Sequence, residues 1–428
     1  MNDEKQYGCR VATPPFLLCG VSSSWRALAL TIPQLWASVG VLLRHPNNID
    51  PSICAHIINT WLERSGILPL TVTIEYMKIN YDRSCTTKST ILADVLSVIC
   101  SHSSRWKNVA ITTWLPVSFP QLQNLPLLRS FHLQVFDLIP VHNTISLPFS
   151  GSPRLTKLSW PYPFDAPPDP QIPWSQISQL CLTSSMTFFA ASEMIRLCPQ
   201  LERFTMELIA ENHGDRRLIT VENRCLRTLT MGVTGHADCS PFFDSLILPE
   251  LGEFTLMGAR SHATTGRRAF LDLLTRSNCK LYKLELHRCA FEPFIQCLEH
   301  ESFKTIQELK IVSNPQFKVD EVIRLTDLPS PPAPRVLLPK LMQLTFQWCL
   351  YVPPGMLAEM VLSRRRQRDG RKAESLQSLV LIHDEFYEED VVAIEDEVKD
   401  GFEADIDLNF ILKANGERTS IPCPCCAP

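Results

Sequence analysis

The sequence lacks several features that would assign it to a familiar functional class. It contains no G-x-x-x-x-G-K-[ST], G-x-G-x-x-G, H-E-x-x-H or G-x-S-x-G, the patterns that hold phosphates, a catalytic zinc or a nucleophilic serine. No apolar run approaches the roughly 18–20 residues that span a bilayer. No Asn-x-Ser/Thr acceptor for glycosylation is present either. These absences predict a protein that is not an enzyme, does not enter a membrane and needs no cofactor.

Charge and cysteine usage are equally ordinary. The 428 residues carry a formal net charge of −4, which argues against nucleic acid as a partner. Most of the 16 cysteines are scattered singly, without the spacing of a small disulfide scaffold. The first 20 residues carry Asp3 and Glu4 and are interrupted by Pro14 and Pro15, unlike a signal peptide. We therefore expect a reducing compartment, the cytoplasm and/or the nucleus.

What the sequence does contain is a recurring hexad, apolar-x-x-apolar-x-apolar. Successive copies start 22 to 35 residues apart, and a weaker copy begins at Trp106. The ten main copies begin at Leu128, Leu155, Ile177, Leu201, Leu226, Leu251, Leu281, Ile306, Leu341 and Leu376. Because the chain of 428 residues exceeds one ordinary core of roughly 100–200 residues, it should contain either two or three domains or one extended repeat array.

The hexad alone is weak, since chance matches arise at about 3% of sites, on the order of ten in a chain of this length. Two further regularities strengthen it. A proline stands two residues before five hexads, at Pro126, Pro153, Pro199, Pro249 and Pro339, where it would stop a preceding helix and begin a strand. Beyond the hexads, one offset is occupied by Cys289, Asn314 and Cys349, and by Ser185, Thr234 and Asp384 in other copies. The leucine-rich repeat consensus places its Asn or Cys there, where the chain turns off the strand.

Helical periodicity appears between hexads, at 189–198, 268–276 and 356–366. A strand, a turn and a helix in each repeat predict an α/β fold, a leucine-rich-repeat solenoid with a curved parallel sheet and helices on its outer side. A (β/α)₈ barrel has a similar unit but closes with eight copies. We expect a helical segment at 1–50, a linker and first strand or cap at 51–100, the solenoid at 101–390, and an acidic cap with a disordered Cys/Pro tail at 391–428.

The hexads also predict a binding surface. On a strand, the residues between the apolar positions face the opposite side of the sheet. Candidates at these positions, which by default are only solvated strand surface, are Arg203, Thr205, Arg227, Thr228, Lys283, Glu285, Lys310, Gln343 and Thr345.

A cysteine cluster and a basic run each have a simple structural interpretation beside a functional one. Cys423, Cys425 and Cys426 alternate with prolines near the end of the chain, so a disordered tail is favoured over a metal site. The basic run from Arg364 to Lys372 follows a predicted helix, whose C-terminal end favours cations. It is also compatible with nuclear import or an acidic partner.

The N-terminal segment predicts one amphipathic helix followed by a short apolar surface. Leu18, Val21, Trp25, Leu28 and Ala29 follow helical spacing, and the helix should end before Pro33. Leu35, Trp36 and Val39 come next. On physical grounds alone, this segment could simply cap the first repeat.

These residues also carry a resemblance. Cys19 to Ala29, with Trp25-Arg26-Ala27-Leu28-Ala29, followed by Pro33-Gln34-Leu35-Trp36, resemble the second half of a fungal F-box. The stretch from Trp61 to Gly66 and Pro69 to Ile74 is similar to the linker and first strand of F-box proteins that continue into leucine-rich repeats. The family's opening Leu-Pro-x-Glu-Ile/Val-Leu helix has no counterpart in residues 1–15, so the motif looks truncated at its N-terminus.

The resemblance implies a substrate-recognition subunit of an SCF-type ubiquitin ligase. The F-box would dock on the Skp adaptor, and the repeats would hold the protein to be ubiquitylated. The residues implied to form the adaptor-facing or core apolar surface are Leu18, Val21, Trp25, Leu28, Leu35 and Trp36. The alternative is an adaptor-independent interaction scaffold whose F-box remnant only caps the array.

Overall fold

The computed structural model describes most of the chain. The described residues are 9–11, 14–45, 51–78, 90–114, 117, 119, 122, 124–136, 151–162, 172–209, 219–234, 238–258, 266–288, 298–312, 325, 337–347, 353–365, 376–382, 386–399, 403–406, 410–412 and 418–420. The chain forms two compact units. Unit 1 comprises Met1–Ser185 and Leu197–Leu201, and unit 2 comprises Met186–Arg196 and Glu202–Pro428.

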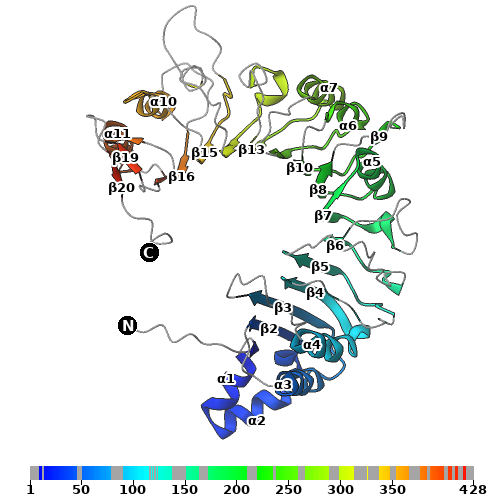
Figure 1. Cartoon of the computed structure of the whole chain (residues 1–428). Helices are drawn as coiled ribbons and strands as arrows, with labels where there is room; N and C mark the ends of the chain where they lie inside the picture. The colour runs from blue at the N-terminus through cyan, green and yellow to red at the C-terminus, as the bar shows by residue number, and fades with distance from the viewer. Residues whose placement is uncertain are drawn as a thin grey trace, which may run out of the picture. The chain divides into compact units, whose positions relative to one another are not determined.

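Unit 1 is built on parallel strands in chain order, β2-β3-β4-β5-β6-β7, with β1 added antiparallel to β2. Helices α3 and α4 lie together along one face of its first strands (Figure 1). Its strands are β1 (Cys9–Val11), β2 (Ser38–His45), β3 (Leu70–Lys78), β4 (Trp106–Thr113), β5 (Ser130–Val135), β6 (Lys157–Trp160) and β7 (Gln179–Met186). Its helices are α1 (Pro14–Val21), α2 (Ser23–Thr31), η1 (Pro33–Trp36), α3 (Pro51–Arg64), α4 (Thr90–Cys100), η2 (Ser103–Arg105) and η4 (Trp174–Gln176).

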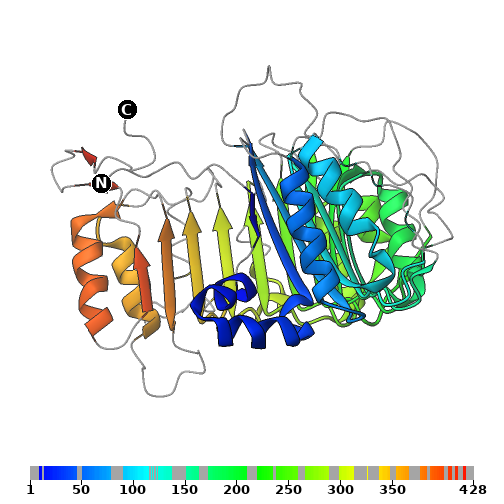
Figure 2. The same cartoon turned by 90° about the horizontal axis from the view of Figure 1, so that it is seen from below.

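Unit 2 repeats this plan with parallel strands ordered β8-β10-β12-β13-β14-β15-β16-β18 (Figure 2). These are β8 (Arg203–Ile209), β10 (Thr228–Thr234), β12 (Glu253–Gly258), β13 (Lys283–His287), β14 (Glu308–Val312), β15 (Gln343–Gln347), β16 (Ser378–Ile382) and β18 (Glu403–Ile406). Small sheets contain β9 (Val221–Glu222) with β11 (Leu246–Ile247), and β17 (Phe386–Tyr387) with β19 (Phe410–Leu412) and β20 (Arg418–Ser420). Helices are α5 (Phe188–Leu197), α6 (Ser240–Asp244), α7 (Arg267–Ser277), η5 (Glu301–Phe303), α10 (Met356–Arg365) and α11 (Glu388–Lys399).

The hexads hold these strands. From Leu128 to Leu376, each of the ten hexads has a strand that begins two residues after its first apolar position. Leu281, Leu284 and Leu286, with 0%, 2% and 1% of their surface exposed, show how the three apolar side chains enter the core. The predicted α/β architecture with a parallel sheet is therefore confirmed. Parallel pairing begins earlier than the predicted array, at β2, because Ser38 is the register partner of Thr71 in β3.

The prolines before the hexads occupy tight turns. Leu128 N donates to Leu125 O at 3.2 Å, and Leu251 N donates to Leu248 O at the same distance. Pro126 and Pro249 are thus the second residues of four-residue turns, a position that favours proline because its ring already fixes φ at the value that the turn requires. Ending a helix, the role that the sequence suggested, is not the general one, since Pro249 follows strand β11.

A second regularity joins successive repeats. The carbonyl of the residue after the first apolar position accepts two N–H groups from the next repeat. Arg227 O accepts from Gly252 N and Glu253 N, both at 3.0 Å, and Gly252 O then accepts from Tyr282 N at 2.9 Å and Lys283 N at 3.1 Å. The same pattern recurs at Arg129 in unit 1 and at Gln307 in unit 2. This shared acceptor fixes the register of each strand on the one before it.

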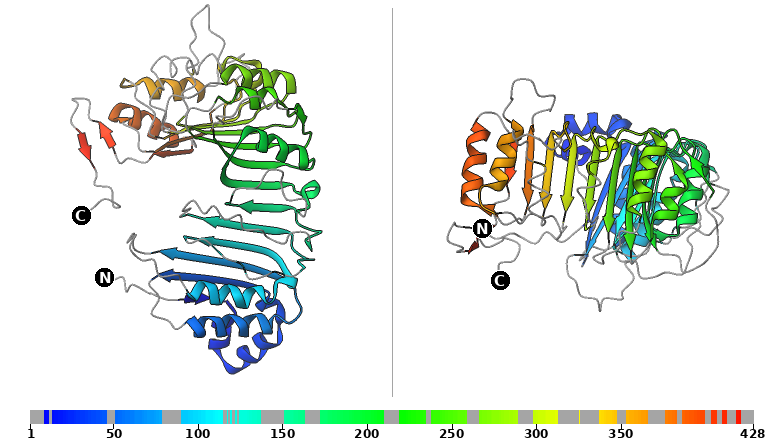
Figure 3. Two further views of the ribbon diagram at one scale, coloured as in Figure 1. Left: turned by 45° about the vertical axis from the view of Figure 1, so that its right-hand side comes forward. Right: turned by 90° about the horizontal axis from the view of Figure 1, so that it is seen from above.

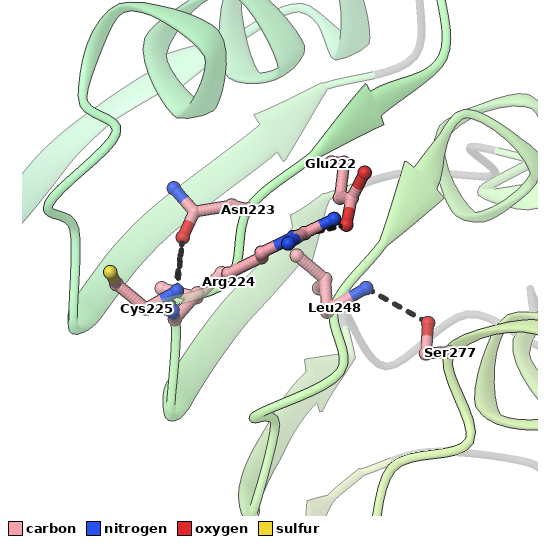
Figure 4. Close-up of polar contacts among 7 residues, drawn as sticks. Glu222, Asn223, Arg224, Cys225, Leu248 and Ser277 are labelled. Atoms are coloured by element: carbon pink, nitrogen blue, oxygen red, sulfur yellow. Dashed lines mark hydrogen bonds and ion pairs between the residues drawn. The ribbon is translucent and has the colours of Figure 1, made fainter.

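In unit 2, two side chains accept hydrogen bonds from backbone N–H groups in the segments that lead into strands β10 and β12 (Figure 4). Asn223 is 2% exposed, and its Oδ1 accepts from Cys225 N at 2.9 Å and Leu226 N at 3.0 Å. In the next repeat, Ser277 Oγ accepts from Leu248 N at 2.9 Å. Both groups satisfy buried N–H donors that would otherwise cost stability.

The offset beyond the hexads was partly misread. Ser185 and Thr234 were expected where the chain turns off the strand, but β7 runs to Met186 and β10 runs to Thr234. Both residues therefore still belong to strands. Cys289, Asn314, Cys349 and Asp384 lie outside the described residues, so the turn predicted there stays a prediction.

The prediction of one continuous N-terminal helix is wrong. Two helices, α1 and α2, are separated by Ser22, whose backbone is extended and whose side chain accepts from Trp25 N at 3.2 Å. Serine at this position is a favoured N-cap, which explains the break. The predicted end before Pro33 is confirmed, because α2 ends at Thr31. Both helices lie at the β2 end of unit 1 (Figure 3).

At the other end of the chain, α11 packs beside α10. Asp390 on α11 is 2% exposed and caps the start of α10, accepting from Gly355 N at 3.1 Å and Ala358 N at 2.8 Å. Ile394 on the same helix is 1% exposed, so this acidic region contributes an apolar side chain to the core. The Cys/Pro tail beyond Ser420 lies outside the described residues. Among the helices described, none combines the length and apolar character needed to cross a membrane.

Candidate functional site

Helices α1 and α2 expose large apolar side chains. Leu17 and Val21 are one helical turn apart on α1 and are each 65% exposed, while Trp25 and Leu28 on α2 are 50% and 58% exposed. We call these four residues the α1–α2 apolar surface. Exposed apolar side chains scattered singly are normal, but a group that includes a tryptophan is a candidate interaction site.

This surface adjoins an aromatic cluster in which Trp36 and Trp61 are buried and Phe16 is half-buried. The Phe16 ring meets Trp36 and Trp61 edge-on at centroid distances of 5.5 and 5.1 Å. Trp36 Nε1 donates to Ala29 O at 2.8 Å, and Trp61 Nε1 donates to Trp36 O at 2.9 Å. The Arg64 guanidinium lies 4.7 Å from the centre of the Trp36 ring. The helix pair is therefore fixed to α3, and its outward side chains are held in place.

The six residues that the F-box resemblance assigns to the adaptor-facing or core surface differ in their exposure to solvent. Val21, Trp25 and Leu28 are exposed, and Leu18 and Leu35 are half-buried. Trp36 is fully buried, so it belongs to the core and cannot face a partner. Leu17 was missed by sequence reasoning, which began the apolar face at Leu18. Its spacing of four residues from Val21 and eleven from Leu28 is the signal that could have identified it.

The candidate repeat-surface residues all lie on the solvent side of unit 2. None is buried: Arg203, Arg227 and Gln343 are exposed, and the others are half-buried. Register places Lys283 beside Glu308, and Glu285 beside Lys310. The hexad pattern therefore assigned the correct face, while the pairing of these charges across strands was not readable from the sequence.

An ion-pair network occupies β13 and β14. Lys283 Nζ lies 3.0 Å from Glu285 Oε1 and 2.6 Å from Glu308 Oε1, and His287 Nε2 lies 3.4 Å from Glu285 Oε2. The hydrogen bond from His287 lowers the pKa of Glu285 most, and the ammonium of Lys283 contributes further, bringing it to about 2 against the opposing effect of burial. These charges neutralise one another within the sheet.

Beside the network, Tyr282 is held close to the backbone of the preceding repeat. A Cβ atom added at Gly252 would overlap the Tyr282 ring, so only glycine permits this close approach. The Tyr282 hydroxyl donates to Glu253. Burial and this bond to a carboxylate raise the pKa of Tyr282 to about 12. The result is a fixed and partly exposed aromatic ring, which is a common anchor in protein interfaces.

Comparison with known proteins assigns this chain to no family. The sequence matches no model of a known protein family and no curated protein. Within the described part of the chain, no three His, Cys, Asp or Glu side chains are grouped so that they could hold a metal ion. The surfaces themselves therefore carry the functional argument.

One row in unit 1 combines reactive residue types. Register places His132, Ser159 and Cys181 side by side on β5, β6 and β7. Burial raises the pKa of the Cys181 thiol, an effect that the Ser159 hydroxyl only partly offsets, and burial lowers the pKa of His132. A thiol held in its neutral form is a poor nucleophile. This row, which spacing along the chain did not reveal, offers no activated group.

Proposed function

We propose that this protein is a substrate-recognition subunit of an SCF-type ubiquitin ligase, built from a partial F-box and leucine-rich repeats. The α1–α2 apolar surface docks on the Skp adaptor, and the solvent-facing strand residues of the repeats bind the protein to be ubiquitylated. The observation that carries the proposal is the exposure of Val21, Trp25 and Leu28, three of the residues that the resemblance assigns to the F-box surface.

Physical chemistry supports this assignment of the helices. Apolar side chains on α1 and α2 remain in water although the adjoining cluster of Phe16, Trp36 and Trp61 is well packed. A partner that covers them gains the hydrophobic contribution that the isolated chain forgoes, about 25 cal/mol for each Å² of apolar surface removed from water. Insertion of such a face into a groove between helices is a common recognition mode.

The repeat geometry supports the second half of the proposal. Stacked repeats present a continuous row of side chains, which suits recognition of an extended protein surface. In unit 2 this row includes Arg203, Lys283, Glu285, Lys310 and Gln343. Its mixture of both charge signs, an aromatic ring and amides is typical of specific protein recognition.

The test is a pull-down with purified Skp adaptor and the full chain. We expect the wild-type chain to bind, and the double variant Trp25→Ala/Leu28→Glu to lose about tenfold or more in affinity, since hot-spot residues each contribute about 2 kcal/mol. The matched control is Ile67→Ala/Ile219→Glu, which alters two apolar residues that are 92% and 65% exposed elsewhere. The control should bind normally.

The competing function is an adaptor-independent scaffold in which α1 and α2 only cap the first strands. Its supporting observation is the aromatic cluster, which joins the helices to α3 as a cap would. It predicts that wild-type chain and double variant both fail to bind the adaptor. That result, with a normally folded chain, would refute the ligase proposal.

A further inference from the structure

Unit 1 carries a group of cations that differs from the charges of unit 2. Lys107, Arg129, Arg154 and Lys157 are all exposed and lie where β4, β5 and β6 begin. We call them the basic edge. None of them was among the candidate residues identified from the sequence, although Arg129 and Lys157 stand between apolar positions of hexads as the candidates of unit 2 do.

Backbone hydrogen bonds show that these residues are neighbours. Arg129 N donates to Lys107 O at 2.8 Å, and Lys157 N donates to Arg129 O at 3.1 Å. Arg154 belongs to the turn that leads into β6, closed by Leu155 N donating to Ser152 O at 3.1 Å. Since adjacent strands are about 4.8 Å apart, the edge spans roughly 10 Å across three strands.

The described part of unit 1 places no acid beside these cations. Its carboxylates are Glu63, Glu75 and Asp94. Glu63 and Asp94 belong to helices α3 and α4, and Glu63 is hydrogen-bonded to Asn59 at 2.7 Å. Glu75 pairs in register with Thr112, near the far end of β4. In unit 2, by contrast, Lys283 is already matched by two glutamates.

Like charges on adjacent strands repel one another, which disfavours the folded chain unless an anion lies between them. We propose that the basic edge binds a short acidic peptide segment, rich in Asp or Glu, of a partner protein. This inference deepens the proposed function and rests on it, because it gives the target a chemical class.

Size and charge favour a peptide over nucleic acid. Proteins that bind DNA commonly neutralise about six to ten phosphates, whereas the basic edge offers four cations on a chain of net charge −4. Alternate side chains of an extended peptide are about 6.6 Å apart. Two or three carboxylates of such a peptide can therefore reach long lysine and arginine side chains on neighbouring strands.

The test uses the purified full chain and fluorescence anisotropy. The probe is a fluorescein-labelled dodecapeptide of alternating Glu and Ser, compared with the same peptide in which Gln replaces Glu. We expect binding of the Glu peptide only. The affinity should fall by about tenfold between 50 and 500 mM NaCl, because exposed charges are screened.

The deciding variant is Lys107→Glu/Arg129→Glu/Lys157→Glu, which should weaken peptide binding by about tenfold or more. The matched control, Arg268→Glu/Lys280→Glu/Lys340→Glu, makes the same charge change at exposed residues of unit 2 and should stay within about twofold after correction for net charge. If the deciding variant does not fold, Lys107→Ala/Arg129→Ala/Lys157→Ala replaces it. Equal losses in both triple variants, or no binding by wild type, would overturn the inference.

The inference would also be overturned if a 20-nucleotide single-stranded DNA bound more tightly than the Glu peptide and the deciding variant lost this DNA binding. Binding of the deciding variant to the Skp adaptor is measured as well, so that failure of this inference can be distinguished from failure of the proposed function. Adaptor binding without peptide binding by the wild-type chain rejects the acidic target alone, while peptide binding without adaptor binding rejects only the ligase role.

Discussion

At the scale of single residues, Glu285 combines three features that isolated strand positions seldom share. It faces solvent on β13, accepts from His287 and pairs with Lys283. Such a network contributes more than an isolated surface pair, because Lys283 and Glu285 each have two partners. Its contribution can be measured through pH.

We predict that Glu285→Gln lowers the free energy of unfolding by ~1 kcal/mol at pH 7, a figure reduced for solvent screening of this half-exposed group. The carboxylate's pKa falls from 4.5 to about 2 on folding. Its stabilisation is therefore complete above about pH 4.5 and is lost as the pH falls toward 2. Urea unfolding at pH 7, 5 and 3 measures the difference from wild type, which should shrink at pH 3. Glu250→Gln, at an exposed turn, is the control, and a constant difference at all three pH values would contradict the prediction.

At the scale of elements, the hexads identified the strands because burial of three apolar side chains is a local pattern. Helices α5, α7 and α10 were also found, within one residue at each end. Strand β2 was missed although Trp36-x-x-Val39-x-Val41 completes a hexad and all three side chains are buried, because Trp36 and Val39 were assigned to the N-terminal apolar surface. The break at Ser22 was missed because an apolar period continues across it.

Asn223 shows how one side chain supports a whole element. Its Oδ1 serves two N–H groups at the entrance to β10. We predict that Asn223→Ala lowers the free energy of unfolding by about 2 kcal/mol, because buried donors lose their acceptor. Asn223→Asp retains the acceptor and should recover part of this loss. The exposed neighbour Arg224→Ala should leave the unfolding midpoint unchanged, and an equal effect of both alanine variants would count against the role of Asn223.

At the scale of the whole molecule, the sequence identified most of one surface and missed the other. Val21, Trp25 and Leu28 of the α1–α2 apolar surface were identified, whereas the basic edge depends on register between strands that belong to different repeats. The hexads fixed which residues face solvent. They did not show which charges are neutralised by neighbours.

Buried thiols offer a measurement for each unit separately. Burial raises the pKa of Cys100 and Cys198 in unit 1 and of Cys239 in unit 2 to about 12, and that of Cys279 in unit 2 to about 11. The thiolate is the reactive form, so these residues should react with a thiol reagent only after local opening. In repeat proteins stability is largely a sum over neighbouring repeats.

We therefore predict that Asn223→Ala accelerates labelling of Cys239 and Cys279 by about tenfold or more, as a loss of about 1.4 kcal/mol or greater implies when opening is local. Labelling of Cys100 should remain at the wild-type rate, whereas Cys198 should also be accelerated, because Asn223 Nδ2 donates to Ile195 O at 3.5 Å in the adjoining repeat. Mass spectrometry of labelled peptides follows each site. Uniform acceleration at all four thiols would show that the chain opens as one unit.

The carbonyl that accepts two N–H groups at each strand entrance has a consequence for how such a chain can diversify. The bond pair at Arg227 closes one of the shorter repeats, and the pair at Gln307 closes one of the longest, yet the geometry at the entrance is the same. Residues added to a connection between strands therefore leave the hydrogen bonds at the strand entrances unchanged. New segments can be acquired on the connecting side during evolution while the alignment of the binding strands is inherited intact.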